Sequence, residues 1–108
     1  FIGMYKKLIL NNLNFNKKIV QFFKESNSDL NSDEMSEAGE WVTYNRAWSY
    51  IKKIDLGNEN HISSLEKHND EYFETTIKLG IKFFEEEEQY ERCALLKKIQ
   101  DISENLKR

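Results

Sequence analysis

The chain has 108 residues, 32% of them charged, and its formal net charge is -3. This length fits one domain with a single core, so we expect one domain over residues 1–108. The mildly acidic balance lacks the basic excess that a broad nucleic-acid interface requires, and we therefore expect no direct binding of nucleic acid. Phe1, Ile2 and Gly3 precede the first methionine, Met4, and we interpret them as an extension left over from cloning.

Cysteine and apolar content exclude several further classes of protein. Cys93 is the only cysteine, so neither an internal disulfide nor a cysteine-based metal knuckle is available. Apolar runs are only a few residues long, whereas a membrane span needs roughly 20 apolar residues. The apolar run after Lys6 and Lys7 stops at Asn11, too early for the stretch of about 7–15 residues in a signal peptide. These features predict a cytoplasmic protein that has no contact with a membrane.

Proline is absent and glycine is rare, so few signals interrupt a helix. Lysine and asparagine are abundant, a composition typical of AT-rich genomes such as those of low-GC bacteria and their phages. We therefore predict helices wherever the spacing of apolar residues allows them.

The N-terminal half is expected to form two helices. The first covers about residues 5–24, and an asparagine-rich stretch at 11–16 leaves open a break into two shorter helices. A polar loop is predicted over residues 25–31. The second helix is predicted to begin near Ser32, a suitable N-cap, and to stop by Gly57. Its inner apolar stripe is expected to comprise Trp41, Tyr44, Trp48 and Ile51.

The C-terminal half is expected to form two more helices. The third is predicted to start at Asn58 or Asn60 and to continue without a break to Phe83. The apolar stripe changes phase between Glu85 and Tyr90, which predicts a tight turn, and the fourth helix covers residues 90–106. The predicted fold is therefore all-α, a small antiparallel bundle of about four helices that ends in a helical hairpin.

Few residues suggest chemistry. His61 and His68 are the only histidines, and without a Glu-x-x-His or His-Glu-x-x-His pattern we interpret both as solvated surface residues. The acidic run at residues 85–88 lacks the glycine and alternating ligands of a calcium loop, so we interpret it as a solvated turn. Cys93 has no histidine near it in sequence and is interpreted as a small buried residue. We therefore expect no catalytic residue, no metal and no cofactor, and hence no enzyme.

Residues 90–97 contain an aromatic–acidic pair, two small residues, a leucine and a lysine, in the order Tyr90, Glu91, Cys93, Ala94, Leu96 and Lys97. This pattern resembles the UVR motif, a short helical hairpin of excision-repair nuclease subunits and of some stress-kinase activators. The resemblance implies that the two small residues let the helices of the hairpin approach closely. It also implies docking onto a similar hairpin in another protein or in a second copy. Lys98 departs from the motif, which prefers an acidic residue there.

These observations together predict a non-enzymatic protein–protein interaction module, a small adaptor or regulatory protein. Its partner is expected to be another protein or a second copy of the chain. An exposed apolar patch is expected on the C-terminal hairpin or beside Tyr50 on the second helix. The predicted partner-binding residues are Tyr50, Phe84, Tyr90, Glu91, Leu96 and Lys97.

Two alternative functions stay open at this point. A small acidic inhibitor of the immunity or anti-defence type, encoded by a phage and blocking a nucleic-acid-binding enzyme, would present one continuous acidic face. An enzyme or metal protein would gather His61 or His68 with carboxylates in a pocket. The sequence leaves open the identity of the partner, the oligomeric state and the biological process.

Overall fold

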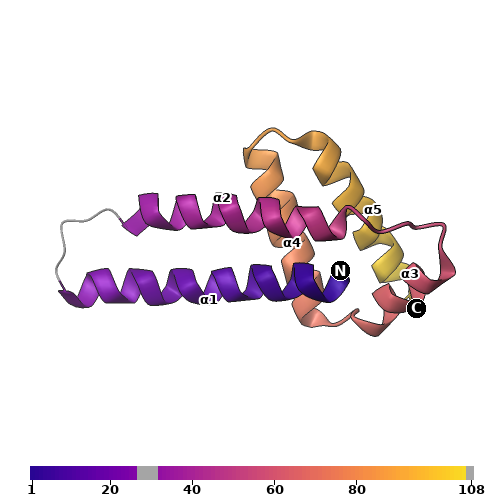
Figure 1. Ribbon diagram of the computed structural model, residues 1–108, viewed down its shortest axis with the longest axis horizontal. Coiled ribbons are helices and arrows are strands. Elements are labelled where there is room, and N and C mark those ends of the chain that lie inside the picture. The colour runs from indigo at the N-terminus through magenta and orange to yellow at the C-terminus, as the bar shows by residue number, and fades with distance from the viewer. Residues whose placement is uncertain (27–31, 107–108) are drawn as a thin grey trace.

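The computed structural model describes the backbone of residues 1–26 and 32–106 and the side chains of residues 1–18, 21 and 38–106, and this part of the chain contains helices and no strand. The helices are α1 (Ile2–Ser26), α2 (Ser32–Ile51), α3 (Glu59–Lys67), α4 (Glu71–Glu86) and α5 (Tyr90–Leu106). They form two antiparallel pairs, α1 with α2 and α4 with α5, and α1 also packs against α4 (Figure 1). The α1–α2 pair extends well beyond the α4–α5 pair at one end (Figure 1), so the molecule is elongated, 52 × 26 × 20 Å.

The predicted all-α class is confirmed, but the arrangement differs from a simple four-helix bundle. α1 has no break at its asparagines, because two of them bond across to α2 instead of competing for their own backbone. Asn12 Nδ2 donates to Thr43 Oγ1 at 3.4 Å, and Asn16 Nδ2 donates to Glu40 Oε1 at 3.0 Å. Most of the predicted loop at 25–31 lies outside the described residues, since only Glu25 and Ser26 are described, and both belong to α1.

The first residues of the chain pack into the fold. Ile2 is buried in the core, and the ring of Phe1 packs edge-on against His61 with the centroids 5.0 Å apart. At Gly3, an added Cβ would lie 3.3 Å from Cε1 of His68. The N-terminus of α1 therefore packs against residues of α3 and of the turn that follows it.

The predicted stripe of α2 is only partly correct. Tyr44 and Ile51 are buried and Trp48 packs against the core, but Trp41 is 55% exposed. The ring of Tyr44 stacks on Phe83 with the centroids 4.4 Å apart, close to the end of α4. Trp41 lies about one turn before Tyr44, towards the N-terminal end of α2. α2 ends at Ile51, six residues before Gly57, the residue expected to stop it.

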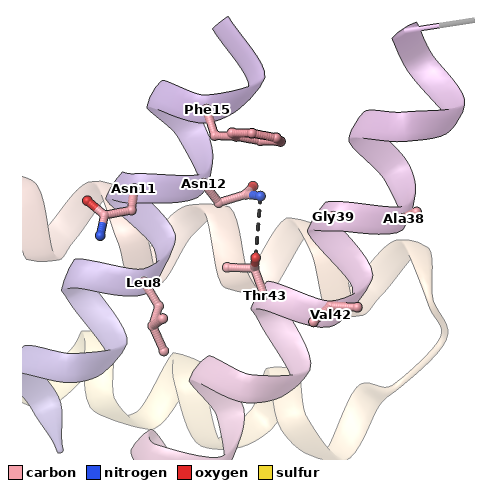
Figure 2. A pocket seen from close by; sticks show the side chains of 8 residues that line it. All are labelled: Leu8, Asn11, Asn12, Phe15, Ala38, Gly39, Val42 and Thr43. Atoms are coloured by element: carbon pink, nitrogen blue, oxygen red, sulfur yellow. Dashed lines mark hydrogen bonds between the residues drawn. The ribbon is translucent and has the colours of Figure 1, made fainter. Parts of the chain in front are cut away.

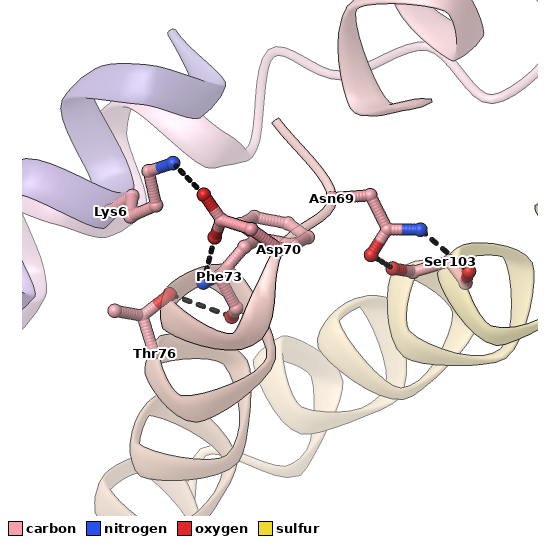
Figure 3. Close-up of polar contacts among 6 residues, drawn as sticks. All are labelled: Lys6, Asn69, Asp70, Phe73, Thr76 and Ser103. Carbon is pink, nitrogen blue, oxygen red and sulfur yellow. Dashed lines mark hydrogen bonds and ion pairs between the residues drawn. The ribbon is translucent and has the colours of Figure 1, made fainter. Parts of the chain in front are cut away.

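The predicted third helix is wrong, because the chain breaks it into α3 and α4 between Lys67 and Glu71. Asp70 is the N-cap of α4, and its Oδ1 accepts the backbone N–H of Phe73 at 2.8 Å (Figure 3). Its other oxygen pairs with Lys6 Nζ at 3.0 Å. The side chain of Asn69 donates from Nδ2 to the carbonyl of Ser103 on α5 at 2.8 Å (Figure 3).

The turn between α4 and α5 is confirmed at the predicted place. α4 ends at Glu86 and α5 begins at Tyr90. Glu88 adopts the left-handed conformation with φ 59°, which lets the N–H of Gln89 donate back to the carbonyl of Phe84 at 2.8 Å. Satisfying this carbonyl ends α4 tightly and turns the chain directly into α5.

The two helix pairs meet where α1 crosses α4. Tyr5 is fully buried, and its hydroxyl donates to the carbonyl of Thr76 at 2.7 Å. Gly80 lies beneath it, and a Cβ added there would be 2.2 Å from Oη of Tyr5 and 3.1 Å from Cδ1 of Leu96. Burial raises the pKa of Tyr5 far above its usual range and keeps its hydroxyl protonated as a donor. The crossing therefore requires a residue without a side chain at position 80.

We expect Gly80→Ala to destabilise the fold by about 1–3 kcal/mol, the usual cost of overpacking a core. Tyr5→Phe removes the atom nearest to the new Cβ, so the double variant should lose less than the sum of the two single changes. Urea unfolding of the four proteins measures this coupling.

Gly39→Ala is the matched control for Gly80→Ala. Gly39 is also a helical glycine, but a Cβ added there would lie 3.9 Å from its nearest neighbour, Nδ2 of Asn12. The change should stabilise the protein, because alanine favours helix by about 0.8–1 kcal/mol over glycine. Equal losses at both glycines would contradict the close crossing at Tyr5.

Asp70→Ala should cost about 1 kcal/mol at neutral pH, the usual loss for an N-cap. The N–H of Phe73 and the ammonium of Lys6 hold the pKa of Asp70 below its ordinary value of 3.8. Because the folded pKa is lowered, the stabilisation by the carboxylate is present above pH 3.8 and is lost as the pH falls through the lowered pKa. The melting temperatures of the wild-type protein and of Asp70→Asn should therefore differ less at acidic pH than at neutral pH. An equal difference at both pH values would exclude a role of the charge.

Candidate functional site

A groove between α1 and α2 forms a hollow with a volume of about 560 Å³. In Figure 2, Leu8, Asn12, Phe15 and Thr43 lie between the two helices, and other helices pass behind them. No residue of α3, α4 or α5 lines it among the described residues. The lining residues, which define the groove from here on, are Leu8, Asn11, Asn12, Phe15, Ala38, Gly39, Val42 and Thr43.

The groove arises because α1 and α2 each carry two apolar faces. Leu8 and Phe15 are seven residues apart, about two helical turns, and so share one face of α1. Tyr5 and Ile9 occupy another face, which is buried in the core. Because Ile9 directly follows Leu8, the faces are about 100° apart around the helix. One face of α1 is therefore buried in the core, while the other lines the groove, where Leu8 also packs against the core.

On α2 the same division occurs with smaller side chains. Val42 lies one turn from Ala38 on the groove face, whereas Tyr44 and Ala47 are buried in the core. Gly39 has no side chain to occupy the space between the helices, and the nearest atom to its position is the amide of Asn12. Small residues on α2 thus leave the hollow that the larger side chains of α1 border.

Polar groups join the two helices beside the groove. Asn12 is buried, and its Nδ2 donates to Thr43 Oγ1. Its Oδ1 accepts from Nδ2 of Asn16 at 3.4 Å, and the same Nδ2 reaches Glu40. These bonds fix how α1 and α2 lie against each other, so the groove between them is a formed feature of the pair.

Two large apolar side chains at the groove are accessible to a partner. Phe15 is 51% exposed and Val42 is 59% exposed. Trp41, the neighbour of Val42, is 55% exposed but does not line the groove. Phe15 and Val42 therefore offer apolar surface at the groove that a second molecule could cover.

The six residues predicted to bind a partner do not form one surface. Phe84 and Leu96 are fully buried in the core, so their side chains cannot contact a partner in this conformation. Phe84 packs edge-on against Trp48 of α2 with the centroids 5.9 Å apart, and Leu96 lies close to Gly80 of α4. Tyr90 is 65% exposed, and Lys97 pairs with Glu85 at 3.2 Å.

The remaining two predicted residues are also separate from the groove. Tyr50 is half-buried, with Lys53 Nζ 5.6 Å from the centroid of its ring. Glu91 is exposed at the start of α5 and lines a smaller hollow of about 390 Å³ around the α4–α5 turn. Apart from Tyr90, its other lining residues are Glu88, Gln89 and Arg92, so it offers little apolar surface to a partner.

Arg92 is held within the fold. Its guanidinium lies 5.1 Å from the ring centroid of Trp48 and 5.2 Å from that of Phe84. Nη1 donates to Oδ1 of Asn45 at 2.8 Å, which ties the start of α5 to α2. Burial lowers the pKa of Arg92. These contacts give Arg92 a structural role as a cation packed on aromatic rings.

The histidines are half-buried, which corrects their interpretation as solvated surface residues. Nδ1 of His61 accepts the N–H of Asp55 at 2.8 Å, so that nitrogen already has a partner. Burial and the nearby Lys6 lower the pKa of His68. Across the described ranges, no group of three or more His, Cys, Asp and Glu residues is placed to hold a metal ion.

Cys93 is buried, as predicted, and its Sγ contacts the carbonyl of Ile81 at 3.5 Å. Burial and the charge of Glu85 raise the pKa of its thiol, which lowers its reactivity. No helix in the described part of the chain is long and apolar enough to cross a membrane.

Comparison of the chain with protein-family models, curated proteins and solved structures finds no match. The groove is therefore interpreted from its own side chains. Sequence analysis missed it as a site, although two signals were present. Val42 lies off the inner stripe of α2, and Leu8 and Phe15 keep a seven-residue spacing through the asparagine-rich stretch.

Because Phe15 and Val42 contribute mainly to the surface, truncating either to alanine should change the free energy of unfolding by about 0.5 kcal/mol or less. Leu65→Ala, at a fully buried position, should cost about 2–5 kcal/mol. Urea unfolding at low protein concentration makes the comparison. A loss at Phe15 or Val42 as large as at Leu65 would assign the groove to the core.

Proposed function

We propose that this chain is a non-enzymatic protein–protein interaction module, a small adaptor or regulatory protein of the cytoplasm, that docks through the groove. One observation carries the proposal: Phe15 and Val42 each expose about half or more of their surface at a preformed hollow. Burying apolar surface is the main driving force of protein association, and contiguous apolar patches mark interaction sites.

The chemistry of the groove supports binding over catalysis. Its eight lining residues include no titratable side chain, so no acid or base faces the space that a ligand would enter. The polar groups Asn12 and Thr43 already bond to each other across the helix pair. A partner therefore meets apolar surface bordered by a few amides and a hydroxyl, as at many protein interfaces.

The distribution of charge does not favour an acidic inhibitor. α1 contains five lysines and one glutamate, whereas α2 contains four acidic residues and one arginine. The two neighbouring helices thus have opposite charge. A nuclease inhibitor that imitates nucleic acid needs acidic residues over one whole face.

A photo-crosslinking amino acid at position 42 tests the function in cells of the organism that encodes the chain. Its side chain would stand at the groove, so we expect covalent capture of a polypeptide on illumination. The same amino acid at position 72, where Tyr72 is 65% exposed on α4, is the control and should capture much less.

A second change makes the crosslinking specific. Phe15→Glu places a charge in the groove and should abolish capture from position 42, because burying an unpaired carboxylate is costly. Circular dichroism checks that the variant stays helical. No capture at position 42, or equal capture at positions 42 and 72, would contradict a docking role for the groove.

A further inference from the structure

This inference rests on the proposed docking through the groove and names its occupant. We propose that the groove binds the groove of a second copy of the chain. The two α1–α2 pairs then form a four-helix bundle, in which α1 of each copy faces α2 of the other. The α4–α5 pairs lie outside this bundle.

Charge selects a second copy as the occupant. α1 is basic, with one glutamate and five lysines, of which Lys6 pairs with Asp70 of its own chain, and α2 is acidic, with four acidic residues against one arginine. A two-fold axis parallel to the helices places each basic helix opposite the acidic helix of the other copy, and the two run antiparallel. A two-fold axis perpendicular to the helices would instead oppose like charges, α1 to α1 and α2 to α2. The helix pair is therefore complementary to itself in one symmetric arrangement.

The geometry of the chain leaves room for this contact. The core faces of α1 and α2 pack towards α4, through Tyr5 against Thr76 and through Tyr44 against Phe83. The groove is lined by α1 and α2 alone, and in Figure 2 the other helices pass behind the pair. Two copies can thus meet at their grooves while their α4–α5 pairs stay on the outer sides.

Layer packing also supports the arrangement. Beyond the α4–α5 pair, α1 and α2 form a single layer of two helices (Figure 1). A helix with an apolar stripe is normally covered by a second layer, and antiparallel four-helix bundles are a common solution. The ring of Phe15 stands over the gap between the helices in Figure 2, where it can enter the groove of the other copy.

Sedimentation equilibrium of the purified chain, residues 1–108, over a range of concentrations tests the proposal. We expect a reversible monomer–dimer equilibrium. Val42→Glu should weaken the dimer at least ten-fold, because it places a carboxylate in the apolar contact. Trp41→Glu is the matched control, since Trp41 is similarly exposed beside Val42 but does not line the groove. Trp41→Glu should keep the monomer–dimer equilibrium constant within about two-fold of the wild-type value, a small change on the usual scale of affinities.

A charge change tests the orientation of the two copies. Lys18→Glu alters an exposed residue of α1 three positions after Phe15, and it should weaken the dimer several-fold. Lys98→Glu makes the same change of charge at an exposed position of α5 and should have no effect. Added salt should weaken the wild-type dimer and reduce the difference that Lys18→Glu makes.

The results separate this inference from the proposed function. A chain that stays monomeric at every concentration, or a dimer weakened equally by Trp41→Glu and Val42→Glu, overturns self-association through the groove. If position 42 then captures a different polypeptide in cells, the interaction function stands with another partner. If it captures nothing, both proposals fail. Capture of a species of twice the chain mass supports both.

Discussion

The close crossing of α1 over α4 determines how the two helix pairs are joined. Tyr5 can donate to the carbonyl of Thr76 only because Gly80 presents no side chain beneath the ring. The stacking of Tyr44 on Phe83 adds a second contact between the pairs, on α2. Both contacts lie on the part of the α1–α2 pair that α4 reaches. Arg92 of α5 adds a third contact between the pairs, through its hydrogen bond to Asn45 of α2.

The groove follows from this arrangement. α1 has 25 residues and α4 has 16, and the two cross, so α4 covers only part of α1. Leu8 and Phe15 line the groove from α1 and Val42 lines it from α2, and no described residue of α4 lines it. Bonds from Asn12 and Asn16 to Thr43 and Glu40 hold the pair together without apolar cover from a third helix. The α1–α2 hairpin is thus longer than α4 can cover, and its uncovered part presents an apolar surface beside polar bonds between the two helices.

Local signals made part of this fold predictable. The turn before Tyr90 was found from the change in stripe phase, because consecutive turns of one helix cannot change phase. The break before Asp70 was missed, because Lys6 and Ser103 supply its partners from distant parts of the chain. The groove was missed for another reason. Amphipathic analysis assigns one apolar face to each helix, and Trp41, placed inside on that basis, is exposed.

Opposite charges on neighbouring helices also limit which partners fit the groove. A partner with a surface of one sign would be attracted by one helix and repelled by the other, so it would gain little net electrostatic energy. The α1–α2 pair of a second copy, related by a two-fold axis, instead places its acidic helix against the basic helix and its basic helix against the acidic helix. In the resulting bundle every helix has two neighbours of opposite charge, one within its own chain and one across the interface. Such alternation also disfavours register shifts and parallel pairings that would bring like charges together.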